Sequence, residues 1–240
     1  PSLWFSDGDG QKVNDDDPIA LAVARIQAGD ILAIKGIGGF HLVCDAGNPE
    51  AVSRLRQCKQ RPTKPLAVMA ANPQSLSAIV ELSETGLSQL QQPSAPIVLL
   101  HKVTARHSTE EAGSGAFVDN PLADSPLAGS PLADNPLAEN IAPGLNQLGV
   151  MLPHTPIHYL LFHQAAGQPQ QLDWLQQPQA LRLVMTSANL SGRPLIYRND
   201  EVVAELANIA DGFLMHDRDI YMRCDDSVVN AVSVEYVAAD

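Results

Sequence analysis

The feature that most constrains the fold is a short apolar run that opens directly into a polar turn. Leu181 to Met185 is apolar and predicts a buried strand. Thr186-Ser187-Ala188-Asn189-Leu190-Ser191-Gly192 follows it without a break. Small hydroxyl and amide residues, with a glycine that permits positive φ, offer many hydrogen-bonding groups at the carboxyl edge of a sheet. Open α/β sheets bind nucleotides at such edges, so this junction predicts an α/β fold with a ligand site.

A cationic segment far upstream complements that loop. Lys59-Gln60-Arg61-Pro62-Thr63-Lys64-Pro65 follows the end of a predicted helix and carries three cations. Lys and Arg at this spacing suit a polyphosphate with its metal. For the cationic segment, the alternative is a solvated helix end, where cations meet the helix dipole. For the loop from Thr186 to Gly192, the alternative is a plain Asx or Ser turn. The two segments together favour a phosphate site.

Helix and strand signals alternate along the chain. Helices are predicted from Asp17-Pro18 through Gln27, from Asn48-Pro49 to an end that delivers Lys59 and Arg61, over most of Pro73 to Gln91, from Pro156 to about Ala165, and from Asp200 to Ile209. Strands are predicted at Ile31 to Ile34, Phe40 to Cys44, Leu66 to Ala70, Ala95 to Leu100, Leu148 to Leu152, Leu181 to Met185 and Asp226 to Ala238. This mixture predicts an α/β fold with a twisted, mixed sheet flanked by helices in a single domain.

A proline-rich repeat interrupts the alternation. Asn120-Pro121-Leu122-Ala123 recurs in three further copies, which begin at Ser125, Ser130 and Asn135. A proline every five residues forbids a regular helix and weakens any strand. Residues 104–140 are therefore predicted to be a surface insertion within one domain that covers residues 1–240. A partner-docking loop is the alternative.

Composition narrows the class of protein. The 240 residues, 45% of them hydrophobic, can form a substantial core. No run approaches the roughly 18 apolar residues of a membrane span, and no signal peptide is visible. A net charge of −12 argues against nonspecific nucleic-acid binding. Cys44, Cys58 and Cys224 lack metal-ligand spacing and indicate reduced thiols of a cytoplasmic protein. The first residue, Pro1, indicates a piece of a longer protein.

Lys59-Gln60-Arg61-Pro62, taken with the segment from Thr186 to Gly192, resembles the paired signature of the YrdC family. The resemblance spans almost the whole chain, leaving out the proline repeats and the last residues. It implies the YrdC-like fold and activation of a carbamate by ATP, which gives a carbamoyl adenylate and pyrophosphate. ATP and Mg²⁺ are the implied cofactors.

Several stretches are more specifically similar to the YrdC-like domain of the HypF family, the carbamoyltransferases of NiFe-hydrogenase maturation. These stretches are residues 34–42, 64–69, 142–146, 148–153 and 223–228. The similarity implies that carbamate derived from carbamoyl phosphate becomes carbamoyl-AMP, which feeds synthesis of the cyanide ligand. It also implies missing acylphosphatase, zinc-finger and carbamoyl-transfer domains of a parent protein, and HypE as the downstream carbamoyl acceptor.

Two departures separate the chain from the threonylcarbamoyl-adenylate synthases of the same family, the first alternative. Those enzymes carry a Pro-Thr-Glu triplet where this chain has Lys35-Gly36-Ile37. They also carry an arginine where this chain has Met151, and a thioether cannot pair with an α-carboxylate. A substrate without an α-carboxylate, such as plain carbamate, explains the second difference. A noncatalytic nucleotide- or RNA-binding module is the second alternative, and the acidic charge argues against RNA.

The chemistry and the resemblance assign roles to individual residues. Adenylate formation depends on positioning and charge neutralisation, so Lys59 and Arg61 are the predicted catalytic residues. The predicted nucleotide-binding residues are Lys59, Arg61, Lys64, Thr186, Ser187, Asn189, Ser191 and Arg223. The predicted substrate-binding residues are Lys35, Gly38, Gly39 and His41, and no metal ligands are assigned.

Two further groups of polar residues are given structural roles. His154 and His158 are expected to be packing residues at a helix start. Asp225 and Asp226 are expected to balance Arg218 and Arg223, with a contact to Mg²⁺ as the alternative.

Overall fold

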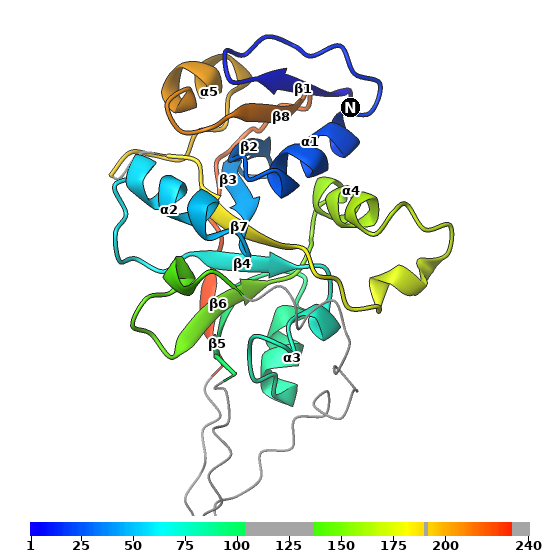
Figure 1. Ribbon diagram of the computed structural model, residues 1–240, viewed down its shortest axis with the longest axis vertical. Coiled ribbons are helices and arrows are strands. Elements are labelled where there is room, and N and C mark those ends of the chain that lie inside the picture. The colour runs from blue at the N-terminus through cyan, green and yellow to red at the C-terminus, as the bar shows by residue number, and fades with distance from the viewer. Residues whose placement is uncertain (104–136, 190–191, 232–240) are drawn as a thin grey trace, which may run out of the picture.

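A single mixed sheet forms the centre of the computed structural model, which describes residues 1–103, 137–189 and 192–231 (Figure 1). Its strands are β1 (Leu3–Asp7), β2 (Leu32–Lys35), β3 (Phe40–Asp45), β4 (Ala67–Ala70), β5 (Ile97–His101), β6 (Gln147–Met151), β7 (Arg182–Ser187), β8 (Gly212–His216) and β9 (Val228–Asn230). They lie in the order β1-β8-β2-β3-β7-β4-β6-β5-β9. The pairs β2–β8, β4–β6 and β5–β9 are parallel and the others antiparallel. The predicted mixed sheet is confirmed.

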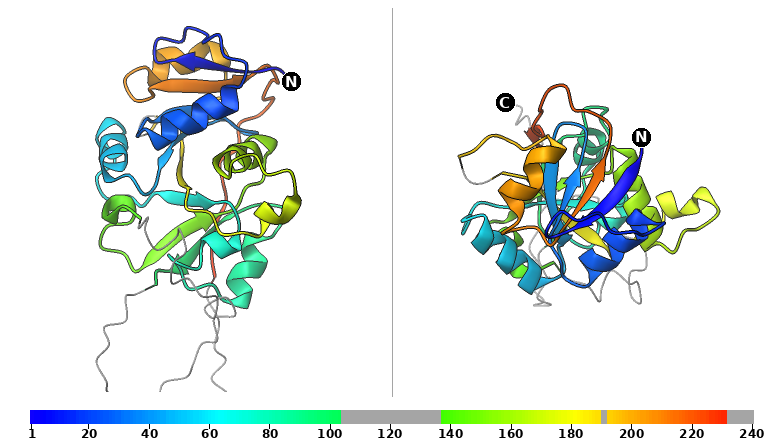
Figure 2. Two further views of the ribbon diagram at one scale, coloured as in Figure 1. Left: turned by 45° about the vertical axis from the view of Figure 1, so that its right-hand side comes forward. Right: turned by 90° about the horizontal axis from the view of Figure 1, so that it is seen from above.

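Helices cover both faces of the sheet (Figures 1 and 2). They are α1 (Pro18–Gln27), α2 (Pro49–Cys58), α3 (Glu84–Leu90), α4 (Pro156–Ala165) and α5 (Asn199–Leu206), with short 3₁₀ turns at Pro73–Ser75, Glu139–Ile141 and Leu172–Leu175. Buried side chains of α1 and α4 share one apolar cluster, and those of α2, α3 and α5 share another. Within the described residues, no helix is long and apolar enough to cross a bilayer.

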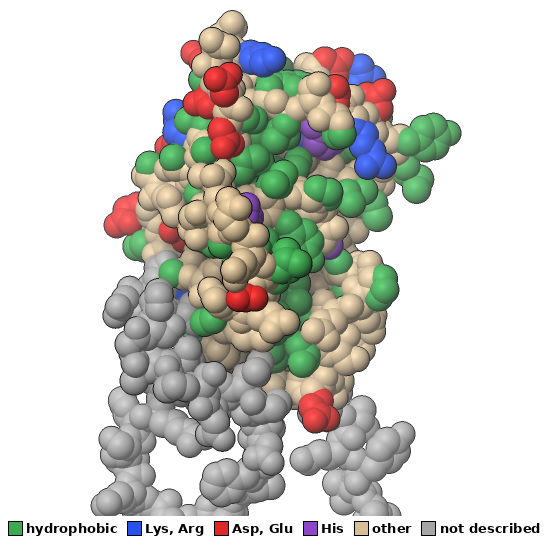
Figure 3. Space-filling view, turned by 90° about the vertical axis from the view of Figure 1, so that its right-hand side faces the viewer, with side chains coloured by type: hydrophobic (Ala, Val, Ile, Leu, Met, Phe, Trp, Pro, Cys, Tyr) green, Lys and Arg blue, Asp and Glu red, His purple; other side chains and the backbone are tan. Residues whose placement is uncertain are grey.

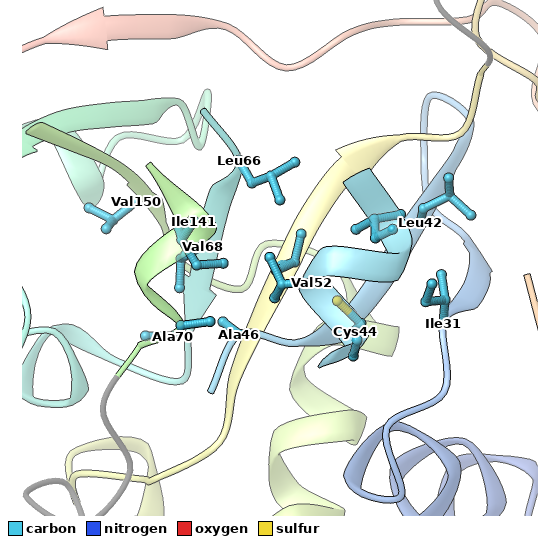
Figure 4. Packing of buried hydrophobic residues seen from close by; sticks show 14 of the residues in the cluster. Ile31, Leu42, Cys44, Ala46, Val52, Leu66, Val68, Ala70, Ile141 and Val150 are labelled. Carbon is cyan, nitrogen blue, oxygen red and sulfur yellow. The ribbon is translucent and has the colours of Figure 1, made fainter. Parts of the chain in front are cut away.

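Strand β3 shows how one strand contributes to both clusters. Phe40, Leu42 and Cys44 lie in the cluster beneath α2, where Figure 4 labels Leu42 and Cys44. Val43 lies in the cluster beneath α1 and α4. Since strand side chains alternate between faces, His41 lies on the same face as Val43. Full burial of a large apolar side chain stabilises by about 1.5–3 kcal/mol. Sliding β3 by one residue would exchange the two faces, so this packing fixes the position of His41.

Side-chain caps begin the two helices nearest the amino terminus, as predicted. Asp17 Oδ1 accepts a hydrogen bond from Ala20 N at 2.9 Å, and Asn48 Oδ1 accepts one from Ala51 N at 2.9 Å. A proline follows each cap, and a cap of this kind is worth about 1 kcal/mol. Helix α2 therefore begins where the sequence predicts, and Lys59 follows its last residue directly.

The predicted helix over most of Pro73 to Gln91 is confirmed only at the two ends of this range. The structure has a 3₁₀ turn at Pro73–Ser75, and α3 begins only at Glu84. Val80, which falls between them, forms an antiparallel bridge with Lys102 beside the sheet. Tertiary pairing at this position overrides the local helical preference.

The described part of the sheet includes β1 and β8, which the sequence analysis did not assign. Strand β1 pairs with β8, and β8 pairs with β2 in parallel, so together they extend the sheet at one edge. The strand predicted over Asp226 to Ala238 is present as β9 at Val228–Asn230. Residues 232–240 lie outside the described residues.

The predicted insertion at residues 104–140 lies largely outside the described residues. Its last four residues are described, and they pack against the domain. Ala138 N donates to Ala46 O at 2.9 Å, and Asn140 Nδ2 donates to Ser53 Oγ at 2.8 Å. Residues 137–140 are therefore part of the packed structure rather than of a surface excursion.

Candidate active site

Lys59 lies directly after α2, and its ammonium group holds the loop that follows β7. Lys59 Nζ donates to Ser187 O at 2.6 Å and to Asn189 O at 2.8 Å, with Asn189 Oδ1 at 3.4 Å. Burial, with the nearby charges of Arg61 and Lys64, lowers the pKa of Lys59 to about 8. An ammonium group has three N–H donors. Two of them make the short bonds to the carbonyl oxygens, and the third makes only the 3.4 Å contact with Asn189 Oδ1. That third N–H is able to donate to an anion.

Arg61, two residues after Lys59, contacts the end of β7 just before the same loop. Its Nη1 donates to Thr186 Oγ1 at 3.0 Å, and its Nη2 donates to Pro65 O at 2.6 Å. Burial, together with the charge of Arg56, lowers the pKa of Arg61. Its Nε is buried and has no hydrogen-bond partner among the described residues. A buried unpaired donor costs about 1–3 kcal/mol, which a phosphate oxygen would offset.

Arg56, which the sequence analysis did not single out, holds the cationic segment in place. Its Nε donates to Asn140 O at 2.6 Å, and its Nη2 donates to Ile141 O at 2.9 Å. Its Nη1 donates to Arg61 O at 2.8 Å and to Lys64 O at 3.0 Å. One buried guanidinium therefore joins α2, the 3₁₀ turn at Glu139–Ile141 and the segment that carries Arg61. The only sequence signal was a cation near the end of an amphipathic helix.

Arg56→Leu is expected to lower the melting temperature by about 4–8 °C. The substitution leaves buried carbonyl groups without donors, at a cost of about 2 kcal/mol for the set, and each kcal/mol shifts a domain of this size by about 2–4 °C. Calorimetric or circular-dichroism melting measures the shift. Arg193→Leu, which removes the exposed pair with Glu205, is the control and should change the melting temperature little. A melting temperature equal to that of the parent would show that Arg56 does not hold the segment.

The loop after β7 is stiffened by its own hydrogen bonds. Ser187 Oγ donates to Asn189 Oδ1 at 2.8 Å, and Asn189 Nδ2 donates to Arg193 O at 2.6 Å. Gly192 has φ of +80°, which confirms the predicted glycine turn. The structure thus brings Thr186, Ser187 and Asn189 to the two cations, whereas Ser191 lies outside the described residues.

Gly38 and Gly39 allow close approach of neighbouring chain segments. Cys224 N donates to Gly38 O at 3.1 Å, and a Cβ on Gly38 would lie within 3.0 Å of Cys224 Cβ. A Cβ on Gly39 would lie 2.6 Å from Leu195 Cγ. Both glycines are therefore required where protein packs on protein. Their contact with the substrate stays a prediction.

The remaining predicted cations are not gathered around the loop in the same way. Lys35 is buried, and its Nζ donates to His216 O at 3.1 Å. Burial lowers the pKa of Lys35, while Asp219 and Asp217 act in the opposite direction. Strand β3 separates Lys35 from β7. Lys64 is exposed but lies near enough to affect the pKa of Lys59, and Arg223 is exposed in the segment after β8.

His41 pairs with Asp226, which corrects one expectation. His41 Nε2 lies 3.1 Å from Asp226 Oδ2, so this carboxylate does not serve to balance Arg218 and Arg223. Burial opposes ionisation of Asp226, but the hydrogen bond from His41 and its charge hold the pKa of Asp226 below its usual range. In the β3–β7 ladder His41 lies opposite Ser187, next to the loop that Lys59 holds.

Two histidines at the start of α4 lie close to this pair. The rings of His154 and His158 meet edge to face, with centroids 4.7 Å apart. His158 is buried, and burial, with the charges of His154 and His41, holds its pKa well below the usual range. On the face drawn in Figure 3, histidine side chains lie among hydrophobic ones. Among residues 1–103, 137–189 and 192–231, no three His, Cys, Asp or Glu side chains converge on a possible metal site.

The fold and the site together define a recognised class of domain. The family model described as "Telomere recombination", which covers the Sua5, YciO and YrdC proteins, matches residues 24–117 and 127–238. The chain therefore belongs to the Sua5/YrdC family.

Its relatives within that family include carbamoyltransferases. The chain is 49% identical to carbamoyltransferase HypF2 of Cupriavidus necator, over 95% of this chain and 25% of that protein. It is 43% identical to carbamoyltransferase HypF of Rhodobacter capsulatus, over 95% of this chain and 24% of that protein. Full-length HypF in its phosphate- and nucleotide-bound form has a similar fold, with a TM-score of 0.71 and 34% identity over 95% of this chain and 24% of that one. The YrdC-like fold is thereby confirmed, and the chain spans about a quarter of the length of these relatives.

Proposed function

We propose that this domain activates carbamate, derived from carbamoyl phosphate, with ATP to give carbamoyl-AMP and pyrophosphate. A carbamate oxygen attacks the α-phosphorus, and the bond from that phosphorus to the pyrophosphate oxygen breaks. The observation that carries the proposal is the convergence of Lys59 and Arg61 on Thr186, Ser187 and Asn189. The nucleotide-bound form of the related HypF supports it.

Each part of the site has a role in this reaction. Lys59 and Arg61 neutralise charge on the α-phosphate and on the leaving pyrophosphate, which is the main task of such a site. The hydroxyl and amide groups of the loop, including Ser191, bind phosphate or ribose oxygens, and Lys64 and Arg223 add charge at the outer end. Mg²⁺ enters with ATP on the phosphates. Lys35, Gly38, Gly39 and His41 bind the small substrate.

The wider context of the reaction follows from the relatives rather than from this chain. In the proposal, acylphosphatase, zinc-finger and carbamoyl-transfer domains of a cytoplasmic parent protein supply carbamate and consume carbamoyl-AMP. HypE is the proposed final acceptor, and hydrogenase maturation with its cyanide ligand is the proposed pathway.

Threonine is not expected to be a substrate. A threonine pocket needs a cation for the α-carboxylate, but the corresponding position is Met151, which is fully buried in the apolar cluster of α1 and α4. Where the synthases carry a threonine, this chain has Gly36. A Cβ added to Gly36 would lie 3.2 Å from Gly39 O. Both anchors are therefore missing.

Product analysis by mass spectrometry tests the assignment. The chain is given ATP and Mg²⁺ with carbamoyl phosphate or ammonium carbamate, or with bicarbonate and threonine. We expect pyrophosphate and carbamoyl-AMP only from the carbamate sources. Threonylcarbamoyl-AMP at a comparable rate would replace the proposal with the synthase alternative, and nucleotide binding without pyrophosphate release in any mixture would favour the noncatalytic one.

A further inference from the structure

The bond between Asp226 and His41 determines which ring nitrogen of His41 carries the proton. The pKa of Asp226 lies below its usual range, so the ionised carboxylate can only accept hydrogen bonds. His41 Nε2, 3.1 Å away, is therefore the donor of this bond. In a neutral imidazole the other nitrogen is then an acceptor. Whenever the ring is neutral, Asp226 thus holds His41 with the lone pair of Nδ1 available.

That second nitrogen has nothing to bind in the described part of the chain. His41 is buried, with 8% of its surface exposed, and its Nδ1 has no hydrogen-bond partner there. It lies beside the turn that follows β2, because a Cβ placed on Gly36 would be 3.4 Å from it. A buried polar atom without a partner is uncommon in folded proteins and indicates a ligand or an ordered water.

His41 and Lys59 approach the same residue from two sides. His41 lies opposite Ser187 in the β3–β7 ladder, and residues opposite one another in such a ladder are in close contact. Lys59 Nζ binds the carbonyl oxygen of Ser187 at 2.6 Å. Ser187 therefore connects the two groups, since His41 flanks it in the ladder and Lys59 holds its carbonyl oxygen.

Carbamate has the matching polarity. Its carboxylate is the anionic, reacting end, and its amino group is a hydrogen-bond donor that needs an acceptor. The other groups that interact with this pair are His154 and His158, and burial keeps His158 neutral near pH 7. No further acidic group interacts with His41 in the described residues to compete for the amino group.

We propose that Nδ1 of His41 accepts a hydrogen bond from the amino group of carbamate, and that Asp226 is the positioning residue that presents this nitrogen. The inference rests on the proposed function and specifies how its substrate is recognised. It explains selection of an unsubstituted carbamate, because a substituent on the nitrogen would replace one N–H and add bulk beside the buried His41 ring.

Three variants test the pair: His41→Phe, Asp226→Asn and the double variant, with Asp225→Asn as the control at the exposed neighbouring carboxylate. In ATP–pyrophosphate exchange at pH 8, each single variant should raise KM for ammonium carbamate about 10-fold, since a buried donor left unpaired costs about 1–3 kcal/mol. The affinity for AMP by calorimetry should stay within about 2-fold. The double variant should resemble His41→Phe, since Asp226 acts through His41.

The outcomes separate this inference from the proposed function. A parent chain that exchanges no pyrophosphate with carbamate overturns both. If the parent exchanges pyrophosphate but the AMP affinity of the variants falls as much as their KM rises, the inference alone is overturned. The same holds if the effects of the two single substitutions add up in the double variant. A ¹⁵N spectrum of the histidine rings gives a readout independent of turnover. The His41 signals, assigned by their loss in His41→Phe, should show the proton on Nε2, and a proton on Nδ1 would contradict the proposal.

Discussion

A Lys59→Met variant is expected to form carbamoyl-AMP about 10³-fold more slowly than the parent. Loss of one electrostatic contact to a developing charge typically costs about 10²–10³ in rate. Here the same substitution also leaves the carbonyl groups of Ser187 and Asn189 without their donor, so the loop itself is released. Lys12→Met, at an exposed lysine next to β1, is the matched control. Initial rates of pyrophosphate release compare the three proteins, and a Lys59→Met rate near that of the control would remove Lys59 from the mechanism.

The lowered pKa of Lys59 gives this prediction a second readout. Because the pKa in the folded protein is about 8, the ammonium form is complete below that pH and is lost as the pH rises through it. ATP affinity should therefore fall across this window in the parent, and bound phosphate should move the midpoint upward. The fall should be absent from Lys59→Met. The same fall in both proteins would assign it to another group.

Arg61→Ala is expected to slow adenylate formation by about 10²–10³-fold while weakening ATP binding much less. The guanidinium holds Thr186 and retains a buried, unpaired Nε, so its charge is available to a group that forms in the transition state. ATP–pyrophosphate exchange measures the rate, and calorimetry measures the affinity. Arg198→Ala is the control, since that arginine is exposed and pairs only with its neighbours on the same helix start.

A different balance of effects would change the role of Arg61. Equal losses of affinity and rate would make it a residue for ground-state binding. A variant with the rate of the parent would make it a structural bridge between Thr186 and Pro65.

Local signals in the sequence were sufficient to predict where the cationic segment and the loop after β7 lie in the fold. The caps Asp17 and Asn48, each followed by proline, fix where helices begin, and the length of α2 then places Lys59 and Arg61. The apolar run into β7 likewise places the loop from Thr186. These features depend on neighbours within a few residues, which is why the sequence alone predicts them.

The features that the sequence did not predict depend on contacts between distant residues. His41 and Asp226 are 185 positions apart, and nothing local distinguishes this aspartate from Asp225. Arg56 binds carbonyl groups, which carry no sequence signal. Val80 leaves a helical pattern because it pairs beside the sheet with Lys102.

A crystal structure of this chain with Mg²⁺ and a non-hydrolysable ATP analogue tests the central claim most directly. The account predicts that the phosphates lie between the Lys59–Lys64 segment and the loop from Thr186 to Gly192. The third N–H of Lys59 and the Nε of Arg61 should then point at phosphate oxygens. Nucleotide bound elsewhere on the domain, or no binding at millimolar concentration by calorimetry, would contradict the account.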